Sequence, residues 1–414
     1  MTLVGVLAFV VALLVSVMLH EAGHFVTARH YGMKATQFFV GFGPTLFSRQ
    51  RGETEYGIKA IPAGGFVKIV GMTPLEEVAP GDEDRAFFRQ PAGRRTVVLA
   101  AGSTVHFIIA IVLVLGTVLA LGVPDGKAAL LLAPQQCLAT SITSDLKVLP
   151  SSTPDARGTC PTGTVPGVAY AAGLRAGDRV LAAGGTTITD YAAFTRAVRA
   201  SAGTPLTLVV QRDGARRSVT LTPVPTTRPD LTDPKRSVQV GAIGVGQDGV
   251  RLRHVGPTEA LRETGHTLGL IVTGTIDTVT KKLGTITRVY GKDRDPAGFT
   301  GVVGVARVSG EVFNAPIPFA TRLAGFLLLM ASLNLFIGAF NLLPLLPLDG
   351  GHIAVLLFEQ ARDKVKRLGG YAGELVRVDL NKLMPLTLGV VVLFAAFTLW
   401  LVGADIVNPI RLNQ

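Results

Sequence analysis

The sequence predicts a multi-pass α-helical membrane protein with four transmembrane helices, a membrane-associated β-hairpin or small sheet, and one extracytoplasmic α+β domain. Three observations support this fold class. Of the 414 residues, 48% are hydrophobic and only 17% are charged, and the mean hydropathy is +0.43, which is too apolar for an ordinary soluble enzyme. Four apolar runs are long enough to cross a bilayer, and Lys and Arg are concentrated in two of the connecting segments.

The four apolar runs define the expected spans. A hydrocarbon core of about 30 Å needs roughly 20 helical residues. The runs are 3–19, which continues into a turn containing histidines, 97–123, 323–343 and 386–407. The first run lacks the charged start of a signal peptide, and no small-residue cleavage site follows it, so we expect it to remain as a span.

The basic residues predict the orientation. Segments 29–95 and 359–382 are rich in Lys and Arg, so by the positive-inside rule they are cytoplasmic. Both termini and segment 124–322 are then outside the plasma membrane, and the site near the first span's end faces the cytoplasmic leaflet. The net charge of +11 suits anionic lipid headgroups. We expect no nucleic-acid partner, because the sequence has no aromatic and basic patch of that kind.

The chain divides into four expected regions: a membrane core with spans 1 and 2 (1–124), an outer domain (125–235), an outer juxtamembrane region (236–322) and a second core part with spans 3 and 4 (323–414). Gly-Asp and Asp-Gly turns between alternating apolar residues predict strands and a helix in the outer domain. Segment 226–237 is typical of a linker, and 266–284 of an amphipathic helix on the membrane surface. Cys137 and Cys160 both lie outside, as a disulfide or as two unpaired thiols.

The stretch "HEAGH" at the end of the first run carries the candidate chemistry. His20 and His24 are four residues apart, so a helix places both imidazoles on one face with Glu21 beside them. This is the spacing of zinc-dependent hydrolases. A catalytic zinc ion usually takes three protein ligands and keeps one open position, so a third donor must come from elsewhere.

Asp349 is the strongest candidate for that donor. It lies in "NLLPLLPLDGGH", where the prolines break a helix at membrane depth, which is tolerated only when the backbone is buried in protein or lines a wet cavity. The alternative is that Asp349 is a helix cap or a turn residue. His352 could compete as a ligand, but we expect a structural role, and for His106 in the second span we expect packing or a hydrogen bond rather than ligation.

These motifs together resemble the site-2 protease family of intramembrane zinc metalloproteases, in the bacterial branch with one PDZ domain, closest to its actinobacterial members. The resemblance rests on "HEAGH", "GFGP", "AIPAGGFVKIVGM", "AAGLRAGDRVLAAGG", "GVVGVARVSGE" and "NLLPLLPLDGGH". It implies one zinc ion held by His20, His24 and Asp349, Glu21 as catalytic acid and base, and Asn341 holding the substrate or the oxyanion. In "AGSTVHF", Ser103 and His106 stand where many relatives carry Pro and Asn.

The resemblance also implies the partners. Its members cleave single-span membrane proteins such as anti-sigma factors after an upstream site-1 cleavage, and remnant signal peptides. The outer domain would then be a filter that admits only trimmed substrates; the alternative is a plain peptide-binding module.

A substrate segment must be held in an extended form for hydrolysis. Segments "QFFVGFGPTLF" and "TEYGIKAIPAGGFVKIV" predict a β-hairpin or small sheet, whose free edge could add a substrate strand. The candidate substrate-binding residues of this sheet are Gly41, Phe42, Gly43, Gly64 and Gly65. The alternative is that the sheet only packs against the helices.

Two other classes of function compete with a protease. A metal or ion transporter also has acids within the membrane and broken helices, but four spans without an inverted repeat disfavour it. A scaffold that has lost catalysis is disfavoured by the complete set of His20, Glu21, His24 and Asp349.

Overall fold

The computed structural model describes residues 2–72, 78–124, 131–142, 152–155, 157–230, 236–247, 252–291, 294, 298–315, 317–369, 378 and 380–410. The chain forms two compact units. One contains Met1–Val118, Pro257–Ala315 and Arg322–Arg411, and the other is mainly Leu119–Gly256.

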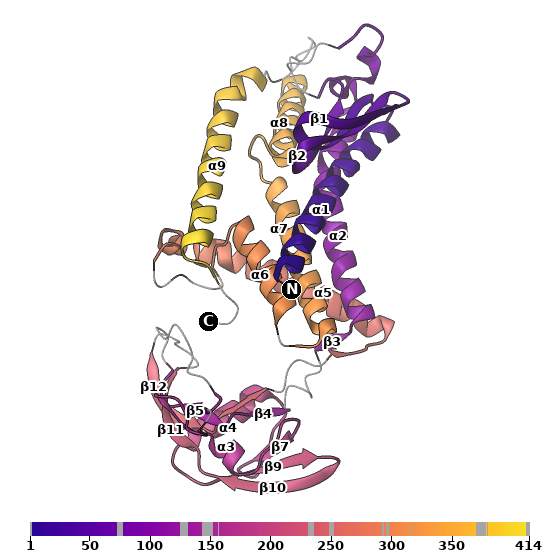
Figure 1. Ribbon diagram of the computed structural model, residues 1–414. Helices are drawn as coiled ribbons and strands as arrows, with labels where there is room; N and C mark the ends of the chain where they lie inside the picture. The colour runs from indigo at the N-terminus through magenta and orange to yellow at the C-terminus, as the bar shows by residue number, and fades with distance from the viewer. Residues whose placement is uncertain are drawn as a thin grey trace. The chain divides into compact units, whose positions relative to one another are not determined.

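Within its described residues, the first unit contains four helices that are long and apolar enough to cross a membrane (Figure 1). They are α1 (Thr2–His30), α2 (Ala92–Ala120), α7 (Phe319–Asn341) and α9 (Met384–Val407), close to the four runs expected from the sequence. The chain is therefore a membrane protein. Helix α1 carries His20 and His24, as expected, and continues to His30.

The other helices of this unit connect or cover the long ones. These are α5 (Pro257–Lys281), α6 (Val302–Asn314), α8 (Asp349–Leu368), and the short 3₁₀ helices η1 (Glu83–Arg85), η2 (Phe87–Arg89), η4 (Leu283–Arg288) and η5 (Leu380–Leu383). Helix α6 packs closely on α1, because a Cβ at Gly5 would lie 2.5 Å from the Ser309 carbonyl oxygen and 2.7 Å from Gly310 Cα. Small residues allow this backbone approach.

The predicted hairpin is formed by β1 (Ala35–Arg51) and β2 (Thr54–Ile69). Repeated register shifts fold the two long strands into a small sheet, in which Phe38 lies opposite both Val67 and Tyr56, whereas Arg49 lies opposite Tyr56 alone. Residues 65–69 therefore form one outer segment of the sheet. The core beneath includes Ile69 and Phe87.

The described residues of the second unit form short strands and two helices. They are β3 (Val123–Pro124), β4 (Leu132–Pro134), β5 (Cys137–Ala139), β6 (Thr164–Pro166), α3 (Val168–Ala171), β7 (Arg179–Ala183), β8 (Thr186–Thr187), α4 (Tyr191–Ala200), β9 (Leu206–Arg212), β10 (Ala215–Leu221), β11 (Val224–Pro229), β12 (Ser237–Ala242), β13 (Val245–Gln247) and β14 (Leu252–Arg253). The largest sheet has the order β10-β9-β7-β8, and alternate residues Leu206, Leu208 and Val210 enter the core with Phe194.

Two expectations for the outer region differ from the structure. The described residues 226–229 and 237 of the expected linker lie in strands, because β11 pairs with β12 from Val224 opposite Ala242 to Pro229 opposite Ser237. The compact unit also runs to Gly256, beyond the expected boundary at residue 235. Thr, Pro and charged residues here form a two-stranded ribbon, which composition alone does not distinguish from a linker. Cys137 and Cys160 form a disulfide.

Candidate metal centre

Three side chains from two distant segments meet beside α1. His20 and His24 are buried, at 7% and 4% exposure, and Asp349 is the first residue of α8. Asp349 Oδ2 lies 3.5 Å from His20 Nε2 and 3.4 Å from His24 Nε2, and the two Nε2 atoms are 3.2 Å apart. The structure therefore brings together the three residues that the sequence analysis singled out as ligands.

The hydrogen bonds of His24 and Asp349 indicate that the three donor atoms can bind a cation. His24 Nδ1 lies 2.7 Å from the Val98 carbonyl oxygen, and a carbonyl only accepts, so Nδ1 carries a proton; in the neutral ring, Nε2 is then the atom whose lone pair can bind a cation. Asp349 Oδ2 is buried without a hydrogen-bond partner among the described residues. The imidazole nitrogens and the Asp349 carboxylate therefore face one another in a buried site, and a cation bound between them would stabilise this arrangement.

The spacing fits zinc. Ligands at about 2.0–2.1 Å from a tetrahedral zinc ion are separated from one another by roughly 3.3 Å, and the three separations here are 3.2–3.5 Å. Two imidazoles and one carboxylate also form a usual catalytic donor set with one position left for water. The bond between His24 and Val98 is the kind of outer contact that orients a metal-binding imidazole.

Gly102 on α2 makes room for both imidazoles. A Cβ there would lie 2.5 Å from His24 Nε2 and 2.6 Å from His20 Nδ1, closer than side-chain atoms normally approach. Hence no side chain larger than hydrogen fits at position 102 with the rings in place.

The backbone around Asp349 is packed equally closely. A Cβ at Gly351 would lie 2.6 Å from Leu345 C and Leu346 N, and one at Gly350 would meet the Leu342 backbone. The two glycines thus let the "LLPLLP" turn fold directly over the start of α8. This turn sets the position of Asp349 relative to the histidines on α1.

Glu21 is the remaining residue of the motif, and it touches the sheet. Its Oε2 accepts a hydrogen bond of 3.1 Å from the Val67 backbone N–H. Val67 belongs to the outer segment of the sheet, so this segment passes directly beside Glu21. The carboxylate is consequently held between the metal donors and a strand edge.

The candidate substrate-binding residues fall into two groups. Those of the sheet lie at three places: the Phe42 ring is 3.3 Å from a Cβ position on Gly64, Gly41 and Gly43 lie against Ile61, and Gly65 lies against Met18 of α1. Gly41 and Gly43 have φ of +85° and +83°, which favour glycine. Asn341 ends α7, and its side chain makes no hydrogen bond within the described residues.

A buried polar cluster that the sequence did not predict lies next to His20. Asn334 Nδ2 donates to the Met330 carbonyl oxygen, so its Oδ1 faces Ser16, which donates to it, and His106 Nδ1 at 2.8 Å. His106 must therefore donate from Nδ1, and its ring lies 5.0 Å from that of His20. The expected hydrogen bond of His106 is present; Ser16, one turn before His20, was the available sequence signal.

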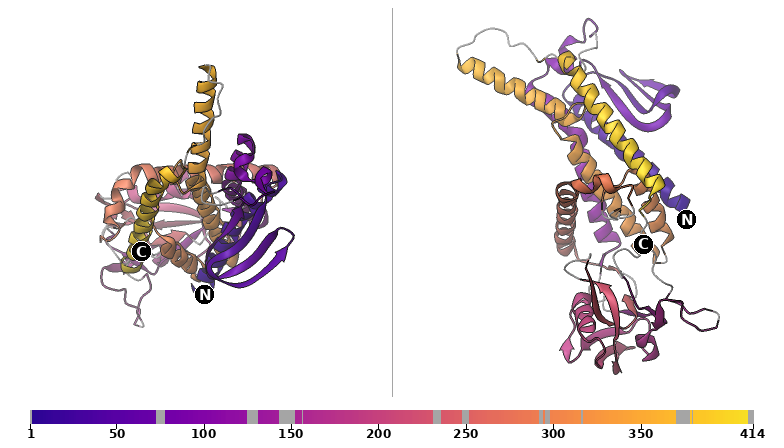
Figure 2. Two further views of the ribbon diagram at one scale, coloured as in Figure 1. Left: turned by 90° about the horizontal axis from the view of Figure 1, so that it is seen from above. Right: turned by 90° about the vertical axis from the view of Figure 1, so that its left-hand side faces the viewer.

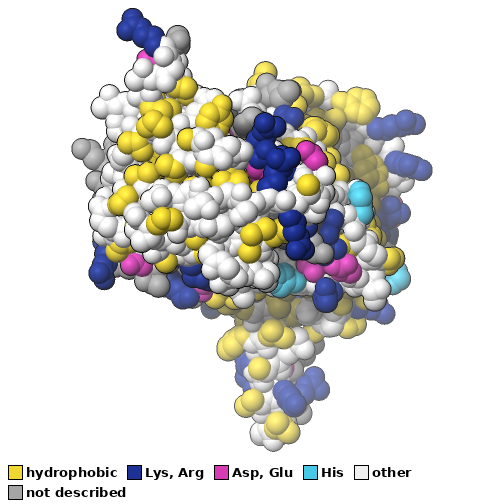
Figure 3. Space-filling view, turned by 90° about the horizontal axis from the view of Figure 1, so that it is seen from below, with side chains coloured by type: hydrophobic (Ala, Val, Ile, Leu, Met, Phe, Trp, Pro, Cys, Tyr) yellow, Lys and Arg dark blue, Asp and Glu magenta, His cyan; other side chains and the backbone are white. Residues whose placement is uncertain are grey.

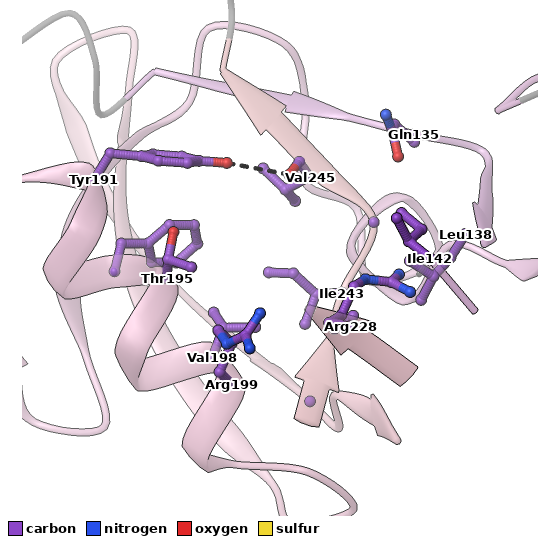
Figure 4. A pocket seen from close by; sticks show the side chains of 14 residues that line it. Gln135, Leu138, Ile142, Tyr191, Thr195, Val198, Arg199, Arg228, Ile243 and Val245 are labelled. Atoms are coloured by element: carbon purple, nitrogen blue, oxygen red, sulfur yellow. Dashed lines mark hydrogen bonds between the residues drawn. The ribbon is translucent and has the colours of Figure 1, made fainter. Parts of the chain in front are cut away.

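The outer unit has a cavity of its own, of about 230 Å³. Figure 4 shows Tyr191, Thr195 and Val198 of α4 facing Ile243 and Val245, and the Tyr191 hydroxyl donates to the Val245 carbonyl oxygen. Arg199 and Arg228 also line the cavity. Burial and the neighbouring Arg199 lower the pKa of the Arg228 guanidinium.

Basic side chains on the face shown in Figure 3 occur in several separate groups, mixed with apolar and neutral ones. They form no continuous basic stripe on that face.

Comparisons with known proteins agree on one family. The profile of peptidase family M50 matches residues 8–373. The chain is 38% identical to zinc metalloprotease Rip1 of Mycobacterium tuberculosis over 424 aligned positions, covering 100% of both chains. It is 37% identical to zinc metalloprotease Rip1 of Mycolicibacterium smegmatis, with 99% of both chains covered.

Proposed function

The chain belongs to peptidase family M50, the site-2 proteases, and is an intramembrane zinc metalloprotease; from this premise we propose that His20, His24 and Asp349 hold its zinc ion and that Glu21 is the catalytic acid and base. The observation that carries the proposal is the set of three donor atoms within 3.5 Å of one another. The relatives' names favour this function over a transporter.

Glu21 performs the proton transfers of the proposed mechanism. Zinc, when bound, supplies Lewis-acid chemistry that activates water and polarises a carbonyl group. Glu21 lies one residue after His20, takes the proton of the attacking water, and passes it to the leaving amine. Asn341 donates its amide to the developing oxyanion, an effect worth about 3 kcal/mol in other proteases.

The substrate is held as an added strand at the outer segment of the sheet, residues 65–69. The bond from Val67 to Glu21 supports this placement, because a peptide running along that segment would pass the catalytic carboxylate. Gly65 lets this segment pack closely on α1, since a Cβ there would lie 2.4 Å from Met18 Sδ, and the Phe42 ring lies beside Gly64.

The four long apolar helices are all spans, with both termini and Leu119–Gly256 outside the plasma membrane and the metal centre near the cytoplasmic leaflet. The basic residues of 29–95 and 359–382 support this orientation. The substrates are single-span membrane proteins, such as anti-sigma factors already trimmed outside, and remnant signal peptides.

The outer unit is a PDZ domain that filters substrates. The alternative, a plain peptide-binding module, would use the cavity between α4 and the segment 241–245, whose two guanidinium groups favour a negatively charged peptide segment. The filter excludes substrates whose outer part is still bulky.

The test is the variant Glu21→Gln, which keeps the size of the side chain but cannot take a proton. In liposomes containing a trimmed single-span substrate, we expect cleavage to be abolished while purified protein still contains one zinc ion per chain. The matched control is Glu263→Gln on α5, far along the chain from the motif, which should leave cleavage unchanged. Continued cleavage by Glu21→Gln would refute the role of Glu21.

A further inference from the structure

Helix α8 has two halves with different surroundings. Near its start, Gly350, Gly351 and Leu356 are buried, and Leu356 belongs to a core cluster with Ala28 of α1 and Leu99 of α2. Its outer half projects sideways from the long helices, as the gold helix in Figure 2 shows. The described part of the chain leaves this outer half largely uncovered.

The outer half carries one continuous apolar surface. Leu357, Phe358, Val365 and Leu368 are 53%, 60%, 68% and 79% exposed, and Ala361 between them is also exposed. At 100° per residue these five positions fall within an arc of about 100° on one side of the helix. We call Leu357, Phe358, Ala361, Val365 and Leu368 the apolar arc of α8.

Basic residues flank the apolar arc. Arg362, Lys364, Lys366 and Arg367 follow one another closely. The same stretch has two carboxylates, Glu359, which is buried and lies 3.8 Å from Arg95, and Asp363, which pairs with Arg362. These charges exclude α8 from the helices that could span a bilayer. An apolar face bordered by Lys and Arg is instead the composition of a helix lying in the headgroup region of a membrane.

We propose that the outer half of α8 lies in an anionic lipid surface, with the apolar arc at the acyl boundary and the four basic residues at lipid phosphates, and that this contact braces Asp349. Because Asp349 is the first residue of the same rigid helix, and 20 helical residues span about 30 Å, tilting the outer end moves the carboxylate relative to His20 and His24. Anionic lipid thereby tightens metal binding. The effect on metal binding rests on the proposed zinc site, whereas the lipid contact does not.

Tryptophan quenching tests the lipid contact in the full chain. The chain has one Trp, so Trp400→Phe gives a silent background in which Val365→Trp, or Leu368→Trp if the first variant folds poorly, reports on the arc. In vesicles of brominated phosphatidylglycerol, we expect blue-shifted and strongly quenched emission. The matched control is Gln360→Trp, exposed on another side of α8, which should stay water-quenched. Equal behaviour at both positions would overturn the proposal.

A second copy of the chain is the other occupant that the experiment detects. In a dimer, the Trp of Val365→Trp would be shielded from water but not quenched by bromolipid, and chains carrying Leu368→Cys would cross-link. That result would assign the apolar arc to a dimer and overturn the proposal.

Zinc retention tests the bracing of Asp349. Chelator competition should show several-fold tighter zinc binding in phosphatidylglycerol than in phosphatidylcholine vesicles. The triple variant Lys364→Gln, Lys366→Gln, Arg367→Gln should lose that difference. Quenching of the arc with zinc affinity independent of lipid charge would refute the bracing. Neither readout requires proteolysis, so a failure here is distinct from failure of the Glu21 assignment.

Discussion

At the scale of single residues, the metal centre depends on the absence of a side chain at position 102 as much as on its donor atoms. Gly102 stands opposite both imidazoles, and the atoms that a side chain there would displace are His24 Nε2 and His20 Nδ1. Neither ring can retreat easily, because His24 is fixed by its bond to Val98 and His20 is buried.

We predict that Gly102→Ala weakens zinc binding by at least about tenfold, in the range that displaced supporting groups cause in other metal sites. Zinc content after dialysis against a chelator measures the effect. The matched control is Gly116→Ala on the same helix, where nothing lies within 4 Å of an added Cβ. Equal zinc retention by the two variants would show that α2 does not confine the imidazoles.

A second residue-scale prediction concerns Asp178 in the outer unit. Burial alone would raise the pKa of this carboxyl, but Arg212, bonded to it twice at 2.6 Å, and the Arg175 N–H hold its pKa below the usual range. A lowered pKa contributes stability that is present above the ordinary carboxyl pKa and is lost as pH falls through the folded value. The outer unit should therefore weaken in acid.

The variant Asp178→Asn should remove that part of the acid sensitivity. It should also cost about 3 kcal/mol at neutral pH, because Arg212 is left without its carboxylate. Protease resistance of the outer unit in urea, measured against pH, gives both quantities. Asp213→Asn serves as the control, since Asp213 has a positive φ that Asn tolerates. A pH profile unchanged by Asp178→Asn would contradict the assignment.

At the scale of elements, three helices are tied together beside the metal centre by Ser16 of α1, His106 of α2 and Asn334 of α7. We predict that Asn334→Ala lowers stability by about 1–2 kcal/mol, since interhelical hydrogen bonds in membranes are worth about 0.6–1.7 kcal/mol each. Thermal unfolding in detergent measures this. Ser332→Ala is the control, because that hydroxyl bonds only within its own helix.

If the two variants unfold at the same temperature, the cluster does not join the helices. If Asn334→Ala loses zinc and Ser332→Ala does not, the cluster also positions His20.

The elements differ in how far the sequence could predict them. The four apolar helices and the shared face of His20 and His24 follow from local composition and the helical period, and the strand pattern around β9 and β10 follows from alternation. Asn334 was not identified, because a single polar residue in an apolar run does not reveal which helix it faces. The ribbon of β11 and β12 was not predicted, because its Thr, Pro and charged residues give neither a clear apolar alternation nor a short turn motif between the strands.

At the scale of the whole molecule, the outer unit is an insertion whose two ends meet. Strand β3 pairs with β14, with Val123 opposite Arg253 and Pro124 opposite Leu252. The chain therefore enters and leaves this unit at neighbouring points. Such an insertion can be excised without separating the segments that flank it.

We predict that replacing residues 125–251 by a short Gly-Ser linker removes the requirement for trimming. The metal donors, Glu21 and the sheet all lie in the other unit, so the shortened protein should cleave a trimmed substrate at the wild-type rate. It should also cleave the untrimmed substrate, which the full chain rejects, because the proposed filter is gone. Both rates are measured by gel in liposomes.

The same excision carrying Glu21→Gln is the control for contaminating proteases. The two substrates then separate the alternatives for the outer unit. A filter acts by exclusion, so its removal raises cleavage of the untrimmed substrate and leaves the trimmed one unaffected. A peptide-binding module acts by recruitment, so its removal would lower cleavage of both. Continued rejection of the untrimmed substrate by the shortened chain would place the discrimination within the membrane unit itself.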